Sequence, residues 1–302
     1  MLIGVDVGGT NLRVGVVDNL RVVSEKRYHA DFSALCHKLE PAQAELAIQD
    51  QLAAALEDML TAYPAVRAIG IGFPGFINPA TQVVSSSPNL PGLSNVDIAR
   101  PLSARLARPV KVENDGLVAA FGEYVLHPDR PAGLIYLGLG TGVGGGLIVN
   151  GQPFAGEHGV SMEVGHIIVE SGGRLCGCGN RGCMEQYASA SGVTLNYAEA
   201  TGQRLDAGAI ANLASQGETS AVVAYAQAGE RLAQGLAHIL KVVDVSSVVI
   251  GGGMSQAWPL METSFGQRLD SDLIPVLRDK INVTISSAGD QAGIIGAALL
   301  AI

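Results

Sequence analysis

The sequence predicts an α/β protein made of two related lobes and one metal-binding segment. Short apolar runs typical of strands alternate with helical patterns along the chain. A strand, a glycine-rich turn and a returning strand occur at residues 2–17 and again at residues 134–149. Three of the four cysteines lie in a third feature, the segment at residues 162–185. Together these observations favour duplicated lobes facing a nucleotide and a bound metal ion.

Composition and charge exclude several classes of protein. The chain has 302 residues, is 48% hydrophobic and 16% charged, and carries a formal net charge of −9, which is typical of an enzyme-sized globular protein. An acidic balance without a Lys/Arg cluster argues against a nucleic-acid partner. Polar residues interrupt the longest apolar run, at residues 239–250, so no membrane span or membrane partner is expected. The start lacks a secretory pattern, and the cysteine usage indicates a reducing cytoplasm.

The first strands are expected at residues 2–7, 13–17 and 22–28. Asp6 lies near the end of the first strand and precedes the turn Gly8-Gly9-Thr10. Backbone N–H groups of such a turn can approach a phosphate closely, and Asp6 could hold Mg²⁺ through water. Asp-Gly-Gly also occurs in ordinary hairpins, so these residues alone leave both interpretations open.

A helix and two strands are expected next. Apolar residues at three- and four-residue steps predict a helix over residues 42–63, ended by Pro64, and a strand follows at residues 65–71. After a short helix at residues 97–107, a strand at residues 109–113 presents Asn114-Asp115 at its C-terminal end, where α/β sheets carry functional groups. A helix then covers residues 116–124. Because an Asp at such a junction is commonly an N-cap, capping and catalysis both remain open.

The second half repeats the plan of the first. A strand at residues 134–139 leads into a glycine loop at residues 140–146 and a returning strand at residues 147–149. The closing helix contains Gly293 and Gly296, which suit close packing. The other expected elements are helices at residues 206–215, 219–243, 259–273 and 292–301 and strands at residues 247–250 and 282–285.

The cysteine-rich segment carries a complete set of metal ligands. Cys176, Cys178 and Cys183 follow His166 and are separated by glycines. One imidazole nitrogen and three sulphurs at this spacing can wrap a tetrahedral Zn²⁺. Buried thiols in an apolar loop are the alternative, but the glycines leave little side chain to pack and suit a tightly turning backbone. Cys36 is left over and is expected to be an inert packed thiol.

Two acidic residues, Glu163 and Glu185, flank these ligands. A metal ion bound between them would fix both carboxylates relative to each other. A binding site for a polyhydroxylated ligand needs such an arrangement.

The motifs follow one another in an order that resembles a known family. They are D-V-G-G-T-N, G-F-P-G, N-D-G, L-G-T-G-V-G-G-G, E-V-G-H, C-G-C-G-N-R-G-C-M-E and V-I-G-G-G. From Gly4 to about Ala298, this order resembles the ROK family of bacterial sugar kinases and sugar-responsive repressors. The resemblance implies a two-lobed, actin-like and hexokinase-like (ribonuclease H-like) ATPase fold with a structural zinc knot. One lobe would comprise residues 1–117 plus about 289–302. The other would comprise residues 118–288, with the zinc-binding segment at 162–185. Closure of the lobes would bend the chain near residues 114–117 and 288–293.

The same resemblance implies roles for individual residues. Asp115 matches the catalytic base, and His166 matches a residue that both ligates zinc and touches the sugar. The sugar would be bound by Gly75, Asn89, Asn114, Asp115, Glu163, His166 and Glu185. ATP and Mg²⁺ would be bound by Asp6, Gly8, Gly9, Thr10, Asn11, Gly140, Thr141, Gly142, Gly144, Gly252 and Gly253. Structural Zn²⁺ would be held by His166, Cys176, Cys178 and Cys183.

Departures from the family pattern occur at two places. Asn11 stands where many members have Lys, which removes a cation near the phosphates. Ser161-Met162 replaces a more usual Ala-Gly before Glu163. The first affects phosphate binding and the second the shape of the sugar pocket.

Two function classes follow from the resemblance. The first is an ATP:hexose 6-phosphotransferase acting on the terminal hydroxyl of glucose, allose or an N-acetylhexosamine; residues 85–91 and 156–160 look most like allose kinase but occur in similar form in the other subgroups. The second is a sugar-sensing regulator without kinase activity, which the family builds with a helix-turn-helix domain before the first glycine turn. Asp6 lies too close to Met1 for such a domain, so the kinase is expected. The resemblance also implies a homodimer.

Overall fold

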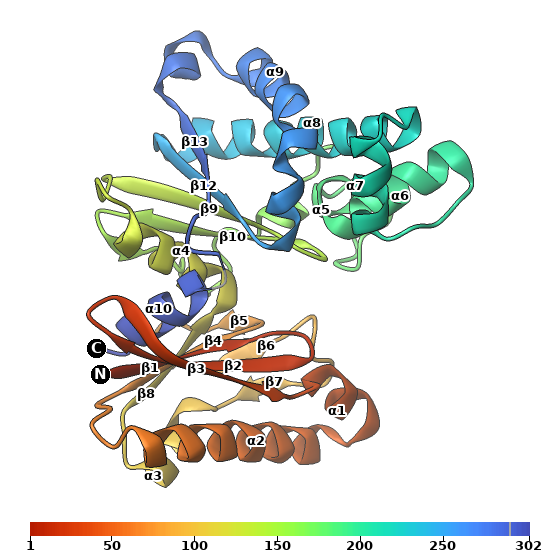
Figure 1. Cartoon of the computed structure of the whole chain (residues 1–302). Helices are drawn as coiled ribbons and strands as arrows, with labels where there is room; N and C mark the ends of the chain where they lie inside the picture. The colour runs from red at the N-terminus through yellow and green to blue at the C-terminus, as the bar shows by residue number, and fades with distance from the viewer. Residues whose placement is uncertain (290) are drawn as a thin grey trace. The chain divides into compact units, whose positions relative to one another are not determined.

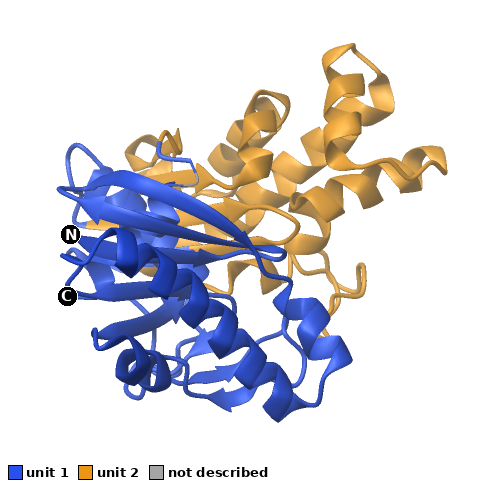
Figure 2. Ribbon diagram, turned by 60° about the horizontal axis from the view of Figure 1, so that its bottom comes forward, with its two compact units in different colours: residues 1–132, 146–161, 288–302 blue, residues 133–145, 162–287 orange. Residues whose placement is uncertain are grey.

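The computed structural model describes residues 1–289 and 291–302, which divide into two compact units. The first unit comprises residues 1–132, 146–161 and 288–302, and the second comprises residues 133–145 and 162–287 (Figure 2). The lobes expected from the resemblance, which would move in catalysis, stay a prediction. One expected hinge, at residues 288–293, includes Asp290, which lies outside the described residues.

The first unit is built on a mixed sheet with the strand order β3-β2-β1-β4-β8 (Figure 1). The first three strands form an antiparallel meander, and β4 and β8 add to β1 in parallel. Val and Ile dominate the buried positions, as suits a pleated, packed surface. The strands are β1 (Leu2–Val7), β2 (Asn11–Asp18), β3 (Arg21–His29), β4 (Ile69–Phe73) and β8 (Val110–Asn114).

Helices cover both faces of this sheet. On one face Leu52 and Leu56 of α2 (Pro41–Ala62) share an apolar core with Ile3 and Val5 of β1 (Figure 1). On the other face α10 (Gln291–Leu300) packs against β1, β4 and α4 (Asp115–Leu126). Burial of these apolar faces is the main stabilising contribution to the unit.

Glycines allow α10 to approach its neighbours at backbone distance. A Cβ atom on Gly4 or Gly70 of the sheet would overlap a carbonyl oxygen of α10. Likewise, a Cβ atom on Gly296 would overlap the carbonyl oxygen of Val118 in α4. The expected role of Gly296 in close packing is therefore confirmed, and the two sheet glycines share that role.

A second five-stranded sheet repeats the plan of the first, with the order β11-β10-β9-β12-β13. As in the first sheet, the last two strands add in parallel to the strand that opens the meander. The duplicated plan predicted from the two glycine turns is confirmed. The strands are β9 (Gly133–Leu139), β10 (Val143–Val149), β11 (Gln152–Pro153), β12 (Ser247–Gly251) and β13 (Asn282–Ile285).

Helices of the second unit are centred on the long α8 (Thr219–Val243). Its residues Leu232, Leu236 and Leu240 are fully buried, as the helical period predicts. Among the described residues, no helix combines the length and apolar character that a membrane span requires. The helices packed with α8 are α5 (Glu185–Ala188), α6 (Ala190–Thr201), α7 (Ala207–Ser215) and α9 (Glu262–Asp272).

The structure differs from several local predictions. Among the described residues it contains three α-helices that were not predicted: α5, α6 and the short α1 (Phe32–Lys38), whose N-cap Asp31 accepts the Ala34 N–H at 2.8 Å. The helix expected from residue 259 begins only at Glu262 and follows a 3₁₀ segment, Gly253–Leu260. The expected glycine loop shrinks to residues 140–142 because β10 begins at Val143. Glycine has a weak propensity for strands, so the sequence of β10 did not predict a strand over its glycines. Hydrogen bonding to the neighbouring strands of the sheet outweighs this propensity.

Smaller elements complete the first unit. The strand expected at residues 65–71 is confined to β4, since residues 64–65 form a turn. The remaining elements of this unit are α3 (Ala99–Leu106), β5 (Phe76–Ile77), β6 (Val84–Ser86) and β7 (Ser94–Val96).

Candidate metal centre and ligand-binding residues

Four potential metal ligands converge in the second unit. One ligand atom from each of His166, Cys176, Cys178 and Cys183 lies within 4.8 Å of all the others. The His166 Nδ1 to Cys176 Sγ distance and the Cys178 Sγ to Cys183 Sγ distance are both 3.6 Å. A tetrahedron of ligands about 2.3 Å from Zn²⁺ has edges of about 3.7 Å, so the donor set fits this ion. The convergence of these four predicted ligands is confirmed.

Local backbone structure builds this cluster. His166 ends the 3₁₀ turn Val164–His166, and the cysteines lie on a tight hairpin whose bridge pairs Ile168 with Cys183. Gly182 has φ +82°, and a Cβ atom there would overlap the carbonyl oxygen of Glu170. Only glycine fits this bend. Gly179 also has a positive φ, of +93°, so the expected tight-turn role is confirmed at Gly179 and Gly182, whereas Gly177 has neither a positive φ nor an atom within 4 Å of an added Cβ.

The thiols differ in their environment. Burial raises the pKa of the Cys183 thiol to about 12 and also raises the pKa of Cys176. The exposed Cys178 thiol accepts a hydrogen bond from the Asn180 backbone N–H, which lowers its pKa. Metal binding must therefore displace protons from buried thiols, and metal affinity should rise with pH.

His166 lies between the metal ligands and the acidic residue Glu163. Its Nδ1 faces Cys176, while its Nε2 lies 3.7 Å from Glu163 Oε2. If Nδ1 ligated a metal, Nε2 would carry the ring proton on the side of this carboxylate, and outer-shell carboxylates commonly orient ligating histidines in this way. Burial raises the pKa of Glu163; the His166 charge opposes this shift and the Glu185 charge adds to it.

Glu185 lies between the cluster and the glycine turn. Its Oε1 is 3.7 Å from Cys176 Sγ, and its Oε2 accepts the Val143 N–H at 3.3 Å. Within the turn, the Gly140 N–H donates to the Gly142 carbonyl oxygen at 3.0 Å. The second unit thus brings Glu163, Glu185, the metal ligands and the predicted phosphate turn into one neighbourhood.

Gly252 and Gly253 follow β12 in the same unit. Gly252 has φ +81°, and a Cβ atom there would overlap the backbone of Leu139 at the end of β9. Its carbonyl oxygen accepts the Ser255 hydroxyl at 2.7 Å. A Cβ atom on Gly253 would meet nothing within 4 Å, so its backbone stays accessible.

In the first unit, Asn114 caps α4 and Asp115 is its first residue. The Asn114 Oδ1 accepts the Leu117 N–H at 3.0 Å, and its Nδ2 donates to the Gly75 carbonyl oxygen at 3.1 Å. Asp115 Oδ1 accepts the N–H of Gly116 at 2.8 Å. The capping role considered for Asp115 therefore belongs to Asn114. A carboxylate here is favoured by the positive end of the helix dipole.

Gly75 and its neighbours form the other side of this region. Gly75 has φ +141°, and a Cβ atom would lie 2.7 Å from the Ser86 carbonyl oxygen. Asn89 lies exposed in the turn that follows β6. Sequence reasoning missed Ser87, whose buried hydroxyl has no hydrogen-bond partner among the described residues. A cluster of serines gave no signal that only one would be buried beside Gly75.

Sequence reasoning also missed Glu113. Its carboxylate accepts the Asn114 N–H at 2.9 Å, and burial raises its pKa. The residue directly precedes Asn114-Asp115, so its position in the motif was the available signal.

Asp6 is accompanied by a cation that was not predicted. Arg13 Nη1 lies 3.4 Å from Asp6 Oδ2, and Arg13 Nε lies 3.0 Å from Glu25 Oε1. The register of β1 and β2 places Arg13 opposite Asp6. The turn between them is closed by the Gly8 N–H, which donates to the Asn11 carbonyl oxygen at 2.9 Å. Arg13 thus supplies positive charge close to the place where Asn11 replaces the expected Lys.

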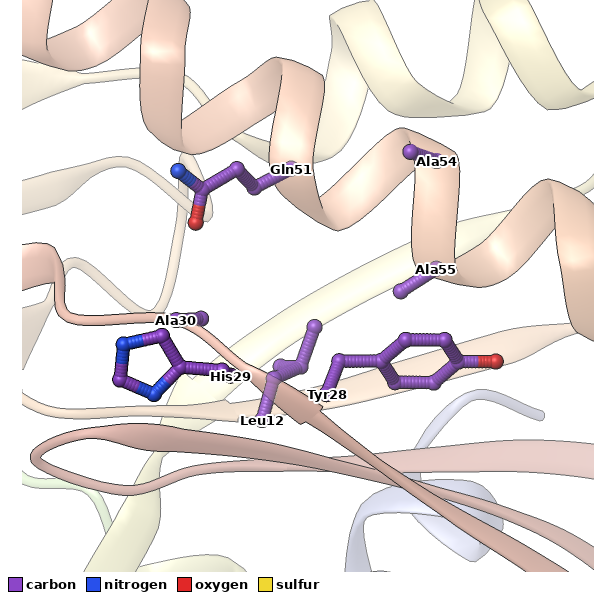
Figure 3. A pocket seen from close by; sticks show the side chains of 7 residues that line it. All are labelled: Leu12, Tyr28, His29, Ala30, Gln51, Ala54 and Ala55. Atoms are coloured by element: carbon purple, nitrogen blue, oxygen red, sulfur yellow. The ribbon is translucent and has the colours of Figure 1, made fainter.

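A hollow of about 250 Å³ lies elsewhere in the first unit, between α2 and the strands β2 and β3 (Figure 3). No predicted site residue lines it. Its walls are mainly apolar, with His29 and Gln51 as the polar exceptions beside the Tyr28 ring. The lining residues are Leu12, Tyr28, His29, Ala30, Gln51, Ala54 and Ala55.

Comparison with known proteins decides the family. The model of the ROK family matches residues 2–302. The chain belongs to the ROK family. The family and the fold expected from the motif order are therefore confirmed.

Two curated relatives match this ROK protein over nearly its full length. A glucokinase from Streptomyces coelicolor is 32% identical over 320 residues, which cover 100% of this chain and 97% of the relative. An N-acetyl-D-glucosamine kinase from Shigella boydii is 33% identical over 323 residues, which cover 99% of each chain. Among solved structures, a ROK family glucokinase from Streptomyces griseus in complex with glucose and AMPPNP has a TM-score of 0.82 at 31% identity, with 99% of this chain and 98% of that chain covered.

Proposed function

We propose that this ROK protein is an ATP-dependent hexose kinase that transfers the γ-phosphate of ATP to the terminal 6-hydroxyl of an aldohexose. One observation carries the proposal: the chain matches, over almost its full length, a glucokinase whose structure contains glucose and AMPPNP, an ATP analogue. Both relatives described above are also sugar kinases by name. None of the three is a transcriptional regulator, and the regulator alternative is not favoured.

Asp115 is assigned the role of general base. Its carboxylate would accept the proton of the sugar hydroxyl as that oxygen attacks the γ-phosphorus, a role worth roughly 10²–10⁴-fold in rate. This assignment is supported by the role of Asn114 as the N-cap of α4, because helix capping then does not depend on the Asp115 side chain. Burial of Glu113 beside it disfavours a second negative charge on that neighbour.

The phosphates are assigned to the glycine turns. Gly9, Thr10 and Thr141 are exposed in the turns after β1 and β9, so backbone N–H groups that the turns do not use themselves suit an anionic ligand. Bound Mg²⁺ would neutralise charge on the transferring phosphoryl group. Asp6 would hold Mg²⁺, with Arg13 fixing the orientation of its carboxylate. The assigned residues are Asp6, Gly8, Gly9, Thr10, Asn11, Gly140, Thr141, Gly142 and Gly144 for phosphates and Mg²⁺, and Gly252 and Gly253 for the adenosine.

Hexose hydroxyls are assigned to carboxylates, an amide and an imidazole. Glu163, Glu185 and His166 Nε2 lie close together in the second unit and can orient hydroxyl groups. One amide N–H of Asn114 already donates to the Gly75 carbonyl oxygen, so its other N–H is the one available to a hydroxyl. The remaining assigned sugar ligands are Gly75, Asn89 and Asp115. Glucose, allose and an N-acetylhexosamine all remain candidate substrates.

The Cys₃His cluster is assigned a structural Zn²⁺. Three sulphurs and one nitrogen fill a tetrahedral shell and leave no position for a reactive water, so the ion would hold the backbone rather than take part in bond-making. Chemically, the soft donor set favours Zn²⁺ over the hard ion Mg²⁺, which prefers oxygen ligands.

A panel of hexoses tested with ATP examines the proposal directly. Glucose, allose, N-acetylglucosamine and N-acetylmannosamine are each incubated with the protein, ATP and Mg²⁺, and ADP release and ³¹P NMR of the product are followed. We expect one sugar to be phosphorylated at its 6-hydroxyl with a kcat/KM clearly above the others. Saturable sugar binding without phosphoryl transfer to any sugar would instead support the sensor alternative and overturn the kinase.

A further inference from the structure

The metal-binding segments contact the backbone of Val143 at both its N–H and its carbonyl oxygen. Glu185, two residues after the ligand Cys183, accepts the Val143 N–H at 3.3 Å. Gly165, directly before the ligand His166, lies so close to the Val143 carbonyl oxygen that a Cβ atom there would overlap it. Val143 is the residue at which the glycine turn enters β10.

The other end of the same turn is held by the chain that follows Glu185. The Ala190 N–H donates to the Gly140 carbonyl oxygen at 2.9 Å. Between these residues, the Ser189 hydroxyl donates to the Glu185 carbonyl oxygen at 2.7 Å and fixes the short helix α5. A Cβ atom on Gly142 would overlap Glu185 Oε2, so a side chain at residue 142 requires the Glu185 carboxylate to move.

We propose that Glu185 is a positioning residue that couples the Cys₃His centre to the glycine turn at residues 140–143. A bound metal would fix Cys183 and His166, which lie within two residues of Glu185 and Gly165 in the chain. Glu185 accepts the Val143 N–H, and Gly165 packs against the Val143 carbonyl oxygen. Loss of either the metal or the Glu185 carboxylate then loosens the turn and weakens the binding of a nucleoside triphosphate, even when no sugar is present. This inference rests on the proposed kinase function only for the identity of the ligand at the turn.

The alternative hypothesis, that the Glu185 carboxylate binds only the sugar, predicts a different result. Removal of the carboxylate would weaken sugar binding and leave the nucleotide affinity of the sugar-free protein unchanged. Residue 142 would also be free to carry a side chain if Glu185 could turn away without loss. Nucleotide affinity without sugar and coupling between residues 142 and 185 therefore separate the two roles.

A double-mutant cycle measures this coupling. Gly142→Ala should push the Glu185 carboxylate off the Val143 N–H, and Glu185→Ala removes it outright, so both act on the same contact. We expect each change to raise the Kd of AMPPNP in sugar-free protein about ten-fold. The Kd of the double variant should not exceed the higher of the two single-variant values. Additive effects, about a hundred-fold together, would overturn the coupling.

Two variants serve as controls: a conservative change at Glu185, and an alanine at a glycine whose surroundings have room for a side chain. Glu185→Gln keeps an oxygen that can accept the Val143 N–H, so it should retain nucleotide affinity within about two-fold while sugar affinity falls. A Cβ atom on Gly144 would meet nothing within 4 Å. The effect of Gly144→Ala on urea unfolding and on AMPPNP affinity should therefore be the same whether residue 185 is Glu or Ala.

Metal removal completes the test. Cys178→Ser should lower the bound metal and raise the AMPPNP Kd without sugar about ten-fold, whereas Cys36→Ser, outside the cluster, should change neither. Equal nucleotide affinity with and without metal would refute the inference. If the wild-type protein binds no AMPPNP, the proposed function fails; the urea-unfolding cycle at residues 142 and 185 still decides whether the coupling exists in the metal-loaded protein.

Discussion

Asn114 and Asp115 follow each other at the start of α4 but have different surroundings. Asn114 uses both ends of its amide, to cap the helix and to hold the Gly75 carbonyl oxygen. Asp115 does not cap the helix, and its Oδ1 accepts the N–H of the adjacent Gly116. Stability and chemistry at this junction should therefore be separable by mutation.

Asp115→Asn should lower kcat by at least about 10²-fold, because an amide cannot accept the hydroxyl proton. Sugar affinity should stay within several-fold, and the melting temperature should hardly change, since Asn114 remains as the cap. Asn114→Ala is the matched variant and should instead cost about 1 kcal/mol of stability. Steady-state kinetics and thermal unfolding give both readouts; a near-normal kcat in Asp115→Asn would rule out the base.

Glu113→Gln should change how stability depends on pH. Burial raises the pKa of Glu113, so the folded protein holds this proton more tightly than the unfolded chain does. The wild type is then favoured at low pH and loses stability as pH rises from about 4, the ordinary value for Glu, through the raised pKa. Gln keeps the oxygen that accepts the Asn114 N–H and does not ionise.

The melting temperature of Glu113→Gln should accordingly exceed that of the wild type at neutral pH and match it at acidic pH. Thermal unfolding at several pH values between about 4 and 8 measures the difference. A difference that does not vary with pH would contradict the burial argument.

At the scale of elements, we expect the hairpin that carries the cysteines to be stabilised by a bound metal ion. Glycines let its backbone turn tightly, and few apolar side chains hold it, since Leu175 and Ile168 are largely exposed. We therefore expect metal ligation to add to the backbone hydrogen bonds that order it, such as the one from the Cys176 N–H to the Asn180 carbonyl oxygen.

We expect one Zn²⁺ per chain in protein purified without added zinc, as measured by elemental analysis. Cys178→Ser should lower both the metal content and the melting temperature and raise the sugar KM, because the hairpin positions Glu163 and Glu185. Protein that is fully folded and active without any bound metal would sink this assignment.

The contact between α10 and the sheet predicts a different sensitivity. Gly70→Ala should destabilise the protein by about 2–3 kcal/mol, because its Cβ would overlap the Ala297 carbonyl oxygen, and a backbone atom cannot rotate away. Gly266→Ala, in α9 with open space around it, is the control and should stabilise by about 1 kcal/mol through helix propensity. Urea unfolding compares the two, and equal effects would contradict the packing argument.

At the scale of the whole molecule, the two sheets share one strand plan although their sequences differ. Each begins with a strand, a glycine turn and a returning strand, and each extends by two parallel strands. The helices around them bury most apolar residues, but α8 leaves Val222, Val223 and Val242 exposed by 42%, 44% and 83%. Val222 and Val223 lie near the start of α8 and Val242 near its end, and the other exposed residues of this helix are polar or charged.

A homodimer stays a prediction that the family resemblance implies. Sedimentation at micromolar concentration should give a species near twice the 31.1 kDa chain mass, that is 2 × 31.1 = 62.2 kDa. A single species near the chain mass would refute the dimer.

The sequence by itself determined the features that depend on local pattern. Ligand spacing identified all four members of the Cys₃His cluster, helical periodicity placed α8 at its observed bounds, and two glycine turns revealed the duplicated plan. Each of these signals lies within a few tens of consecutive residues, where backbone geometry alone restricts the outcome.

Only the tertiary structure decided the contacts between distant segments. Pairing of β1 with β2 places Arg13 beside Asp6, and packing of α5 on the turn before β10 brings Glu185 to the Val143 N–H. The requirement for glycine at residues 4 and 70 likewise depends on a helix more than two hundred residues away. Such contacts are selected by the packing of whole elements, because many registers satisfy the same local pattern and only one fills the core without overlap.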